Sequence, residues 1–349
     1  MNEFLVSISC ITYNQSEYIT DAMNGFAMQQ TNFPFVAVII DDASTDGEQG
    51  VIKAYVEEHF DHSQESGFRE WETEDAFFTF ARHKENKNCH FVAVYLKRNL
   101  FKEPEKKDAV VKEWFEAKYI AICEGDDYWT DPLKLQKQVD YLESHPNCCM
   151  STHAAYFDVN GDLCELGCQH KTEQDLTTNE VIKYGGLYLA TASLIFRKEL
   201  NNDWPEWRKL SNVGDYPLQI LGTLRGKLHF LPEKMCVYRY MHQGSWTYNE
   251  QQIGVNIHRL KTEIAFLNKL DEETDYQYSD AIRYHLIRYY SVLYRNNQAP
   301  FNDYYRVFKK VPDHSYNRLF KDIIIRNFHG LYTLYKKVIA SPNLSTSRL

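Results

Sequence analysis

A regular alternation of short apolar runs with helix-like stretches is the feature of the first 150 residues that most constrains the fold. Apolar runs occupy residues 4–11, 35–40, 91–96 and 119–123, and the stretches 17–28, 49–58 and 109–118 have the character of helices. Strands that alternate with helices form βαβ units, which build a mainly parallel sheet flanked by helices. The sequence therefore predicts an α/β fold with a Rossmann-like sheet.

A further helix is signalled after the last apolar run. Asp131 is a favourable N-cap residue, and Pro132 suits the first helical position. From Leu135 to Leu142 apolar residues recur at spacings of four and three, which makes one apolar stripe, and Pro146 ends the pattern.

An acidic segment interrupts the alternation at residues 57–90. Its first part, 57–75, holds eight Asp and Glu residues against a single basic residue, Arg69. We interpret 57–90 as an irregular, solvated surface insertion. Long loops are often functional, so a role on the acceptor side of an active site stays open.

The last hundred residues differ in character. Residues 1–250 are expected to form the α/β domain and 251–349 a helical C-terminal extension, with helices over 256–270 and 279–294. From 301 to 349 there are nine Lys and Arg against three Asp, and bases interleave with apolar residues over 318–339. Such a helix can lie peripherally on an anionic membrane or pack with its basic face in water, and both interpretations stay open.

Overall charge and composition exclude several classes of protein. A net charge of -9 argues against a general nucleic-acid binder, and no apolar run approaches the roughly 20 residues that span a bilayer. The first ten residues lack the basic start of a signal peptide. Eight cysteines without a C-x-x-C pair suggest reduced, mostly buried thiols rather than a zinc site. Together these features predict a cytoplasmic protein.

Polar residues follow each apolar run, at positions 12–14, 41–42, 97–99 and 124–127. In an open parallel sheet, ligands bind outside the carboxyl ends of the strands. Two of these ends carry adjacent acids, which repel one another unless a cation or hydrogen-bond donors intervene. Oxygen ligands favour Mg²⁺ or Mn²⁺, ions that usually share their shell with substrate phosphates. The absence of a G-x-x-x-x-G-K-[ST] loop and of G-x-G-x-x-G after the first strand argues against P-loop and dinucleotide-binding proteins.

The segments VSISCITYN, VIIDDASTDG and YIAICEGDDYWTDPLKLQKQ occur in this order, and together they resemble family 2 glycosyltransferases with the GT-A fold. The resemblance is closest to bacterial members that transfer sugars onto surface polysaccharides, and it covers about residues 4–250. It implies a GT-A fold and a hexosyltransferase-like, inverting enzyme of polysaccharide biosynthesis. It also implies a nucleotide-sugar donor, with UDP favoured, and a glycan or lipid-linked glycan as the acceptor.

The resemblance also implies a donor site. The expected nucleotide-sugar contacts are Thr12, Tyr13, Asn14, Asp41, Asp42, Arg98, Glu124, Asp126, Asp127 and Arg239. Within this set, Asp41 matches the acid that hydrogen-bonds the base. Glu124 and Asp126 match the two acids of the D-x-D motif, which hold the ribose and a divalent ion. Glu124 stands where Asp is commoner, and a ribose contact tolerates the longer side chain better than metal ligation, so the metal falls to Asp126.

Later segments complete the expected site. Residues 211–218 resemble the family segment that carries the catalytic base, which makes Asp215 the candidate. Residues 237–245 resemble the Y-R-x-H-x-G-S segment near the diphosphate, and 191–193 a strand edge that faces the reaction centre. His242 follows Arg239 by three residues where two is usual, and it is the second candidate ligand for Mn²⁺ or Mg²⁺.

Two alternatives stay open. A sugar nucleotidyltransferase also uses a parallel sheet, acids and Mg²⁺, but usually has a Gly-rich, basic first loop, and residues 12–15 are neither. A non-catalytic sugar- or partner-binding protein on a glycosyltransferase scaffold is the other alternative. The presence of Asp41, Asp126 and Asp215 speaks against such a decayed site.

Overall fold

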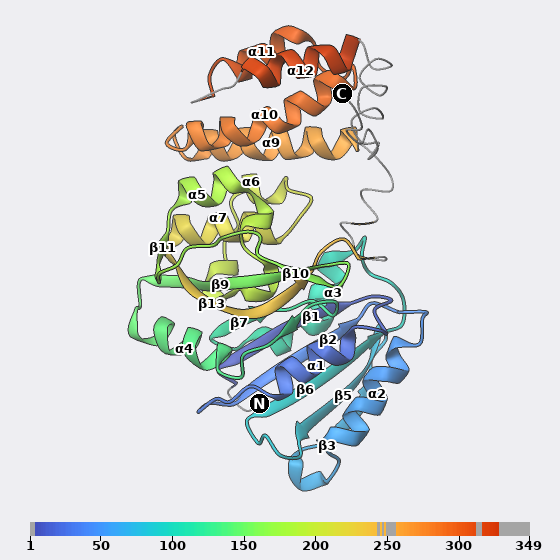
Figure 1. Cartoon of the computed structure of the whole chain (residues 1–349). Helices are drawn as coiled ribbons and strands as arrows, with labels where there is room; N and C mark the ends of the chain where they lie inside the picture. Colours follow the sequence, from blue (N-terminus) through green and yellow to red (C-terminus); the bar gives the residue numbers. More distant parts are fainter. Residues whose placement is uncertain (1–3, 243–244, 246–247, 249–255, 312–315, 328–349) are drawn as a thin grey trace, which may run out of the picture. The chain divides into compact units, whose positions relative to one another are not determined.

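The computed structural model describes residues 4–242, 245, 248, 256–311 and 316–327. The chain divides into two compact units. Figure 1 colours the ribbon by residue number, so that the segments of each unit can be followed. The first unit comprises residues 1–204 and 213–253, and the second comprises 205–212 and 254–349.

One mixed sheet organises the first unit. Its strands are β1 (Val6–Thr12), β2 (Phe35–Asp41), β3 (Phe60–Asp61), β4 (Arg69–Glu72), β5 (Ala76–His83), β6 (Cys89–Leu96), β7 (Tyr119–Ile122), β8 (Tyr128–Trp129), β9 (Cys148–Val159), β10 (Asp162–Cys164), β11 (Gln174–Leu176), β12 (Ile195–Arg197) and β13 (Lys227–Arg239). The main strand order is β11-β13-β9-β12-β7-β1-β2-β6-β5-β3. The central strands β7, β1, β2 and β6 are all parallel, whereas β12 runs antiparallel to both β7 and β9. The four predicted runs therefore form the parallel centre of the sheet, as expected.

Helices flank this sheet and join its strands. In the first unit they are α1 (Ile19–Ala27), α2 (Glu48–His59), α3 (Pro104–Val111), α4 (Lys134–Ser144), α5 (Thr178–Tyr184) and α7 (Asp215–Arg225), with short 3₁₀ turns η1 (Gln64–Ser66), η2 (Lys112–Phe115), η3 (Gly186–Tyr188), η4 (Thr191–Ser193) and η5 (Lys198–Asn201). The α/β prediction is thus confirmed, and the helices expected over 17–28 and 49–58 correspond to α1 and α2.

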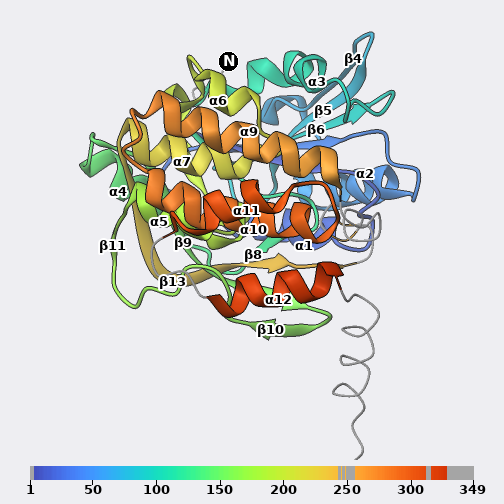
Figure 2. The ribbon, with the colours of Figure 1, turned by 90° about the horizontal axis from the view of Figure 1, so that it is seen from above.

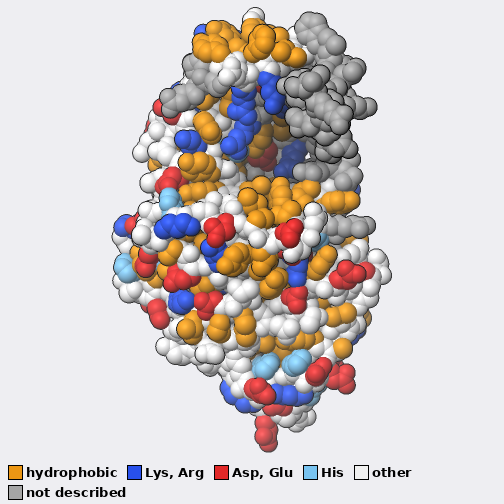
Figure 3. Space-filling model, viewed as in Figure 1, with side chains coloured by type: hydrophobic (Ala, Val, Ile, Leu, Met, Phe, Trp, Pro, Cys, Tyr) orange, Lys and Arg blue, Asp and Glu red, His pale blue; other side chains and the backbone are white. Residues whose placement is uncertain are grey.

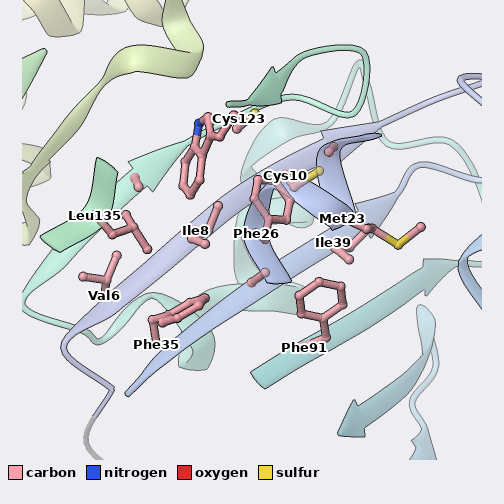
Figure 4. Close-up of a cluster of buried hydrophobic side chains, with 14 of the residues drawn as sticks. Val6, Ile8, Cys10, Met23, Phe26, Phe35, Ile39, Phe91, Cys123 and Leu135 are labelled. Atoms are coloured by element: carbon pink, nitrogen blue, oxygen red, sulfur yellow. The ribbon is translucent and has the colours of Figure 1, made fainter. Parts of the chain in front are cut away.

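Alternate residues of the central strands supply a core on each face of the sheet. On one face, Ile8 of β1, Ile39 of β2 and Phe91 of β6 pack with Met23 and Phe26 of α1, as Figure 4 shows. On the other face, the intervening residues of β2 and β6 pack with β5, α3 and η2. Because the central strands are covered on both sides, β2 and β7 are continuous apolar runs, whereas β1 alternates apolar residues with Ser7 and Ser9.

Truncating the core at Phe91 tests this packing. Phe91 is fully buried, so Phe91→Ala should lower the free energy of unfolding by about 3–5 kcal/mol, through lost apolar burial and the cavity left behind. Phe77 on the neighbouring strand β5 is 48% exposed, and Phe77→Ala is the matched control, with an expected cost below about 1 kcal/mol. Urea unfolding of both variants measures the difference, and equal costs would contradict the assigned packing.

The interpretation of 57–90 as irregular is wrong. The segment continues helix α2 and then forms β3, η1, β4 and β5, and β5 pairs antiparallel with β6 to extend the sheet. Several of its acids have cationic partners, among them Glu72 with Lys97 and Asp75 with Lys106. Figure 3 accordingly shows acidic, basic and histidine side chains mixed at the end of the first unit that carries β3 in Figure 1.

Two helix boundaries also differ from expectation. The helix expected over 109–118 instead begins at Pro104 and ends at Val111, and η2 follows it. The Ser7 hydroxyl donates to the Trp114 carbonyl at 2.5 Å. In a continuing α-helix this carbonyl would instead accept a backbone N–H from the next turn. Helix α4 begins at Lys134 rather than Pro132, since Asp131 caps the preceding turn by accepting the Leu133 N–H at 2.7 Å.

All eight cysteines are free thiols, and six of them are buried. The expectation of reduced, mostly buried thiols is confirmed. Burial raises the pKa of Cys10, Cys89 and Cys123 well above the ordinary value, which keeps these thiols protonated and unreactive.

The second unit is helical. It contains α6 (Glu206–Lys209), α9 (Ile257–Glu273), α10 (Ser279–Arg295), α11 (Phe301–Phe308) and α12 (Tyr316–Asn327). Helices α9 and α10 match the predicted pair and run side by side (Figures 1 and 2), and α10 also packs against α11 and α12.

The predicted basic helix is described only as far as Asn327. Within α12, Leu319 and Ile325 are buried, and the buried Asp322 accepts hydrogen bonds from the Ser291 and Tyr304 hydroxyls, both at 2.6 Å. This part is a packed helix, while residues 328–339 of the prediction lie outside the described residues. None of the helices that the structure describes has the length and apolar content needed to cross a membrane.

Candidate active site

The carboxyl ends of β1, β2 and β7 meet at one edge of the sheet. Thr12 at the end of β1 pairs in register with Asp41 at the end of β2. The loop after β7 continues along β1, because the Cys123 N–H donates to the Ser9 carbonyl and the Gly125 N–H to the Ile11 carbonyl at 3.0 and 3.1 Å. The polar residues that follow these strands are therefore brought together, as expected.

A buried carboxylate, Glu48, holds the first loop in place. It is fully buried at the start of α2 and accepts hydrogen bonds from the Thr12 hydroxyl, from the Gln15 N–H at 3.0 Å and from the Ser44 hydroxyl at 2.7 Å. Burial raises the pKa of Glu48, and the nearby charge of Asp41 adds to that effect, whereas the three hydrogen bonds oppose it. Sequence reasoning missed this residue, whose partners lie more than 30 positions away in two of the three cases.

The residues expected around the nucleotide lie on this loop and on the turn after β2. Asn14 has a positive φ of 55°, and its side-chain oxygen accepts the Thr45 N–H at 2.7 Å, which ties the two loops together. Asp41 is fully buried and accepts a hydrogen bond from the Gln49 side chain at 2.6 Å. Tyr13 is 45% exposed beside them. This edge of the sheet therefore carries one exposed aromatic ring and one buried carboxylate.

Asp42 and Arg98 already have protein partners. The Asp42 carboxylate accepts the Leu100 N–H at 2.6 Å and lies 3.6 Å from the Lys107 ammonium, and the residue is almost fully buried. The Arg98 guanidinium forms a two-pronged ion pair with Glu103. Both side chains thus order the segment that follows β6.

Gly125 lets the acidic loop pack directly on the first loop. A Cβ atom at this position would lie 2.3 Å from the Thr12 Oγ1 and 2.6 Å from the Gln15 Oε1. Since Thr12 is buried and cannot move aside, only glycine fits here without displacing one of the loops. Glu124 and Asp126 flank this contact point.

Asp126 and His242 form a close pair. The His242 Nε2 lies 2.8 Å from the Asp126 Oδ2, and both side chains are mostly buried, with exposures of 13% and 14%. The Tyr18 ring packs edge-on against the imidazole, with a centroid separation of 4.8 Å. The structure therefore joins the two residues predicted to bind a metal.

Arg239 holds this pair from the end of β13. Its guanidinium donates to the Asp126 carbonyl at 2.7 Å and pairs with Asp21 of α1. It lies between two aromatic rings, 4.8 Å from the centroid of Tyr18 and 4.5 Å from that of Tyr128. Sequence reasoning missed Tyr18 and Asp21, because α1 and β13 are more than 200 residues apart.

Asp127, next to Asp126, points into the protein. It is only 1% exposed, and its Oδ1 accepts the Arg239 N–H at 2.8 Å. Its Oδ2 has no hydrogen-bond partner among the described residues. Burial and the charge of Asp126 raise the pKa of Asp127 well above its ordinary value, although the Arg239 N–H opposes this. The adjacent acids thus differ: Asp126 pairs with His242, whereas Asp127 anchors the end of β13.

Asp215 begins helix α7. Its Oδ2 accepts the Thr191 hydroxyl at 3.0 Å, and its Oδ1 accepts the N–H of Tyr216 at 2.8 Å. Glu124 as a whole residue is exposed on the acidic loop. Desolvation of its carboxyl by the surrounding protein nevertheless raises its pKa, and the negative charges of Asp126 and Asp215 raise it further. Asp215 therefore lies within electrostatic reach of Glu124.

The Asp126 carboxylate and the His242 imidazole suit a divalent cation that a substrate phosphate also binds. The part of the chain that the structure describes contains no group of three or more His, Cys, Asp or Glu side chains arranged to hold a metal. However, Mg²⁺ is usually held by one or two protein ligands together with water and substrate phosphates, and imidazole with carboxylate also suits Mn²⁺. Asp126 and His242, beside acids that repel one another, fit such an ion.

The comparisons with known proteins identify the fold. The structure is similar to that of S. aureus TarS 1-349 in complex with UDP-GlcNAc, with a TM-score of 0.55 and 16% identity over 88% of this chain and 81% of that one. No protein-family model matches the chain. The predicted fold is confirmed: a mainly parallel sheet flanked by helices, of the GT-A type, with a helical C-terminal part.

Sequence relatives occur in mycobacteria. Uncharacterized proteins of Mycobacterium tuberculosis and Mycobacterium bovis are 32% identical to the chain over 248 residues. The alignment covers 69% of this chain and 60% of each relative, so the chain spans about three fifths of their length.

Proposed function

We propose that the chain is an inverting, metal-dependent glycosyltransferase of family 2 that moves a hexose from a nucleotide diphosphate sugar to a hydroxyl of a glycan. The observation that carries the proposal is the meeting of three acidic segments on a GT-A fold. Asp41 ends β2, Glu124 and Asp126 follow β7, and Asp215 is close enough to raise the pKa of Glu124.

The donor nucleotide would bind at the ends of β1 and β2. Asp41 accepts a hydrogen bond from the base, Thr12, Tyr13 and Asn14 line the base and ribose, and Glu124 contacts the ribose. The exposed Tyr13 ring offers a face on which a planar base can stack. UDP is the nucleotide we favour. TarS, which shares the fold, has been solved with UDP-GlcNAc.

Asp215 would act as the general base. It removes the proton of the acceptor hydroxyl as that oxygen attacks the anomeric carbon, and the bond from this carbon to the diphosphate oxygen breaks. The electron pair of the broken bond leaves with the nucleoside diphosphate. One displacement with no covalent enzyme intermediate inverts the anomeric configuration.

The charge of the leaving diphosphate needs compensation. A Mn²⁺ or Mg²⁺ ion held by Asp126 and His242 would supply it by neutralising charge on the phosphate oxygens. Arg239 contributes by position, since its guanidinium orients the acidic loop through the Asp126 carbonyl and its backbone N–H binds Asp127.

We further propose that the acceptor is a growing glycan, free or lipid-linked, in bacterial polysaccharide synthesis. The enzyme would work in the cytoplasm, where nucleotide sugars are made. The basic segment 301–349 could hold it at the inner membrane face, although α12 itself packs within the second unit.

Calorimetric titration of UDP, GDP and dTDP, first with Mn²⁺ and then with EDTA, tests the donor site. We expect one nucleotide to bind clearly more tightly than the others and to lose at least about tenfold in affinity when the metal is removed, because an ion held by Asp126 and His242 would neutralise charge on the diphosphate. If none of the three binds under either condition, the chain is instead a non-catalytic sugar- or partner-binding protein on this scaffold.

A further inference from the structure

Lys134 is a fully buried cation at the start of α4. Its ammonium donates to the Gln138 Oε1 at 2.8 Å and lies 4.1 Å from the centroid of the Trp129 ring. Burial lowers its pKa to about 8, and no carboxylate among the described residues offsets that effect. Removing an ammonium from water costs several kcal/mol, so stability alone does not account for a lysine at this position.

Both neighbours of the ammonium hold the same short turn, η4. The Gln138 side-chain N–H donates to the Ser193 carbonyl at 3.0 Å, and the Trp129 indole N–H donates to the Ala192 carbonyl at 2.8 Å. An ammonium can only donate hydrogen bonds, so it turns the oxygen of the Gln138 amide toward itself and the NH₂ group toward Ser193. Lys134 thereby fixes the orientation of Gln138 and packs on Trp129.

Turn η4 in turn holds the carboxylate of Asp215. The turn is closed by the Ser193 N–H and hydroxyl, which both donate to the Ala190 carbonyl, at 2.9 and 2.6 Å. Its first residue, Thr191, donates from its hydroxyl to the Asp215 Oδ2 at 3.0 Å. A shift of the Ala192 and Ser193 carbonyls would therefore carry the Thr191 hydroxyl with it.

We propose that Lys134 is a positioning residue for the carboxylate of Asp215, acting through Gln138, Trp129 and the turn η4. The inference rests on the proposed function, in which Asp215 is the general base. Lys134 is fully buried, which keeps its side chain from direct contact with donor or acceptor. Its loss is thus expected to lower kcat and to leave binding of the nucleotide unchanged.

Lys134→Met is the decisive variant, because methionine keeps the length and apolar stem of lysine without its charge. Removing the desolvated charge favours the folded state, while the Gln138 Oε1 left without its donor opposes it, so the melting temperature should change little. Turnover should nevertheless fall by about 10- to 100-fold, since a misplacement of about 1 Å at a reacting group costs up to that much. The readout is release of nucleoside diphosphate from UDP-, GDP- and dTDP-linked hexoses, with nucleotide affinity measured by calorimetry.

Further variants test the separate links. Gln138→Met should reproduce the effect if Lys134→Met fails to fold. Thr191→Val should lower kcat by a similar factor, and Thr191→Ser, which keeps the hydroxyl, should restore it. Thr223 lies on the same helix as Asp215, and its hydroxyl donates to the Ile220 carbonyl at 2.8 Å, so Thr223→Val is the matched control with unchanged kcat.

Crystal structures separate failure of this inference from failure of the proposed function. In Lys134→Met the contact between the Thr191 hydroxyl and the Asp215 carboxylate should be broken, whether or not the wild-type chain turns over any donor tried. A contact that persists at hydrogen-bond distance, or a kcat equal to that of an active wild type, would overturn the positioning role. If the wild-type chain turns over no donor, the proposed function is contradicted, but the positioning role of Lys134 is not.

Discussion

Asp215→Asn is expected to lower turnover by about 10²–10⁴-fold while the affinity for the donor nucleotide stays the same, which is the usual range for loss of a well-placed general base. Asparagine has the shape of aspartate, and its side-chain oxygen can still accept the Thr191 hydroxyl, which donates to Asp215 at 3.0 Å. What it lacks is the ability to take a proton from the acceptor. Release of nucleoside diphosphate gives kcat, and calorimetry gives the nucleotide affinity.

The control for this variant is Asp175→Asn. Asp175 is an acid of the same unit whose carboxylate pairs with Lys227 at 2.6 Å near the surface, so its loss should leave kcat unchanged. Unchanged turnover in an active Asp215→Asn enzyme would show that this carboxylate only stabilises the first turn of α7. A joint loss of nucleotide binding, turnover and thermal stability would give Asp215 a structural role instead.

The centre of the fold could be predicted because its signal is local. Strands β2, β6 and β7 are buried on both faces and stand out as mainly apolar runs, and β1 has apolar residues at every second position. Strand β4 gave no such signal, since three of its four residues are exposed and only Trp71 is partly buried. At the start of β5 buried and exposed residues alternate, with Ala76 and Phe78 facing the core. The acidic residues that precede this strand led us to interpret the whole of 57–90 as a surface loop.

The candidate site was predictable to the extent that its residues follow strands. Thr12, Asp41 and Asp126 were found because the topology of a parallel sheet places strand ends together. What each acid does at that edge depends on contacts distant in sequence. Asp42 is bound by Leu100 and Lys107, and no local spacing encodes such a pairing.

The same limit explains the buried polar groups that sequence reasoning missed. Glu48 and Lys134 read as ordinary charged residues at helix starts, and both are fully buried. Charged residues are almost never fully buried unless they are bonded, so their positions become informative only once their partners are known. The partners of Glu48 lie on the loops of the proposed donor site. Lys134 bonds Gln138, which in turn bonds the turn η4 beside the proposed base.

The second large effect is expected for Asp126→Asn, which should abolish the metal-dependent part of nucleotide binding. The variant keeps an oxygen that can face His242 but loses the negative charge that a divalent ion requires. Its nucleotide affinity in Mn²⁺ should equal that of the wild type in EDTA, and turnover should fall by at least about 10²-fold, as on loss of other groups that stabilise developing charge. Calorimetry with and without metal measures the first quantity, and release of nucleoside diphosphate the second.

A double-mutant cycle with His242→Ala decides whether Asp126 and His242 share one ion. If both hold the same Mn²⁺, either single change removes the metal response, and the double variant should be no worse than Asp126→Asn alone, because coupled sites are non-additive. Asp131→Asn is the control, as its carboxylate pairs with Lys137 and caps the turn before α4. Additive losses would show that Asp126 and His242 act independently of each other. An unaltered metal response in Asp126→Asn would show that other residues hold the ion.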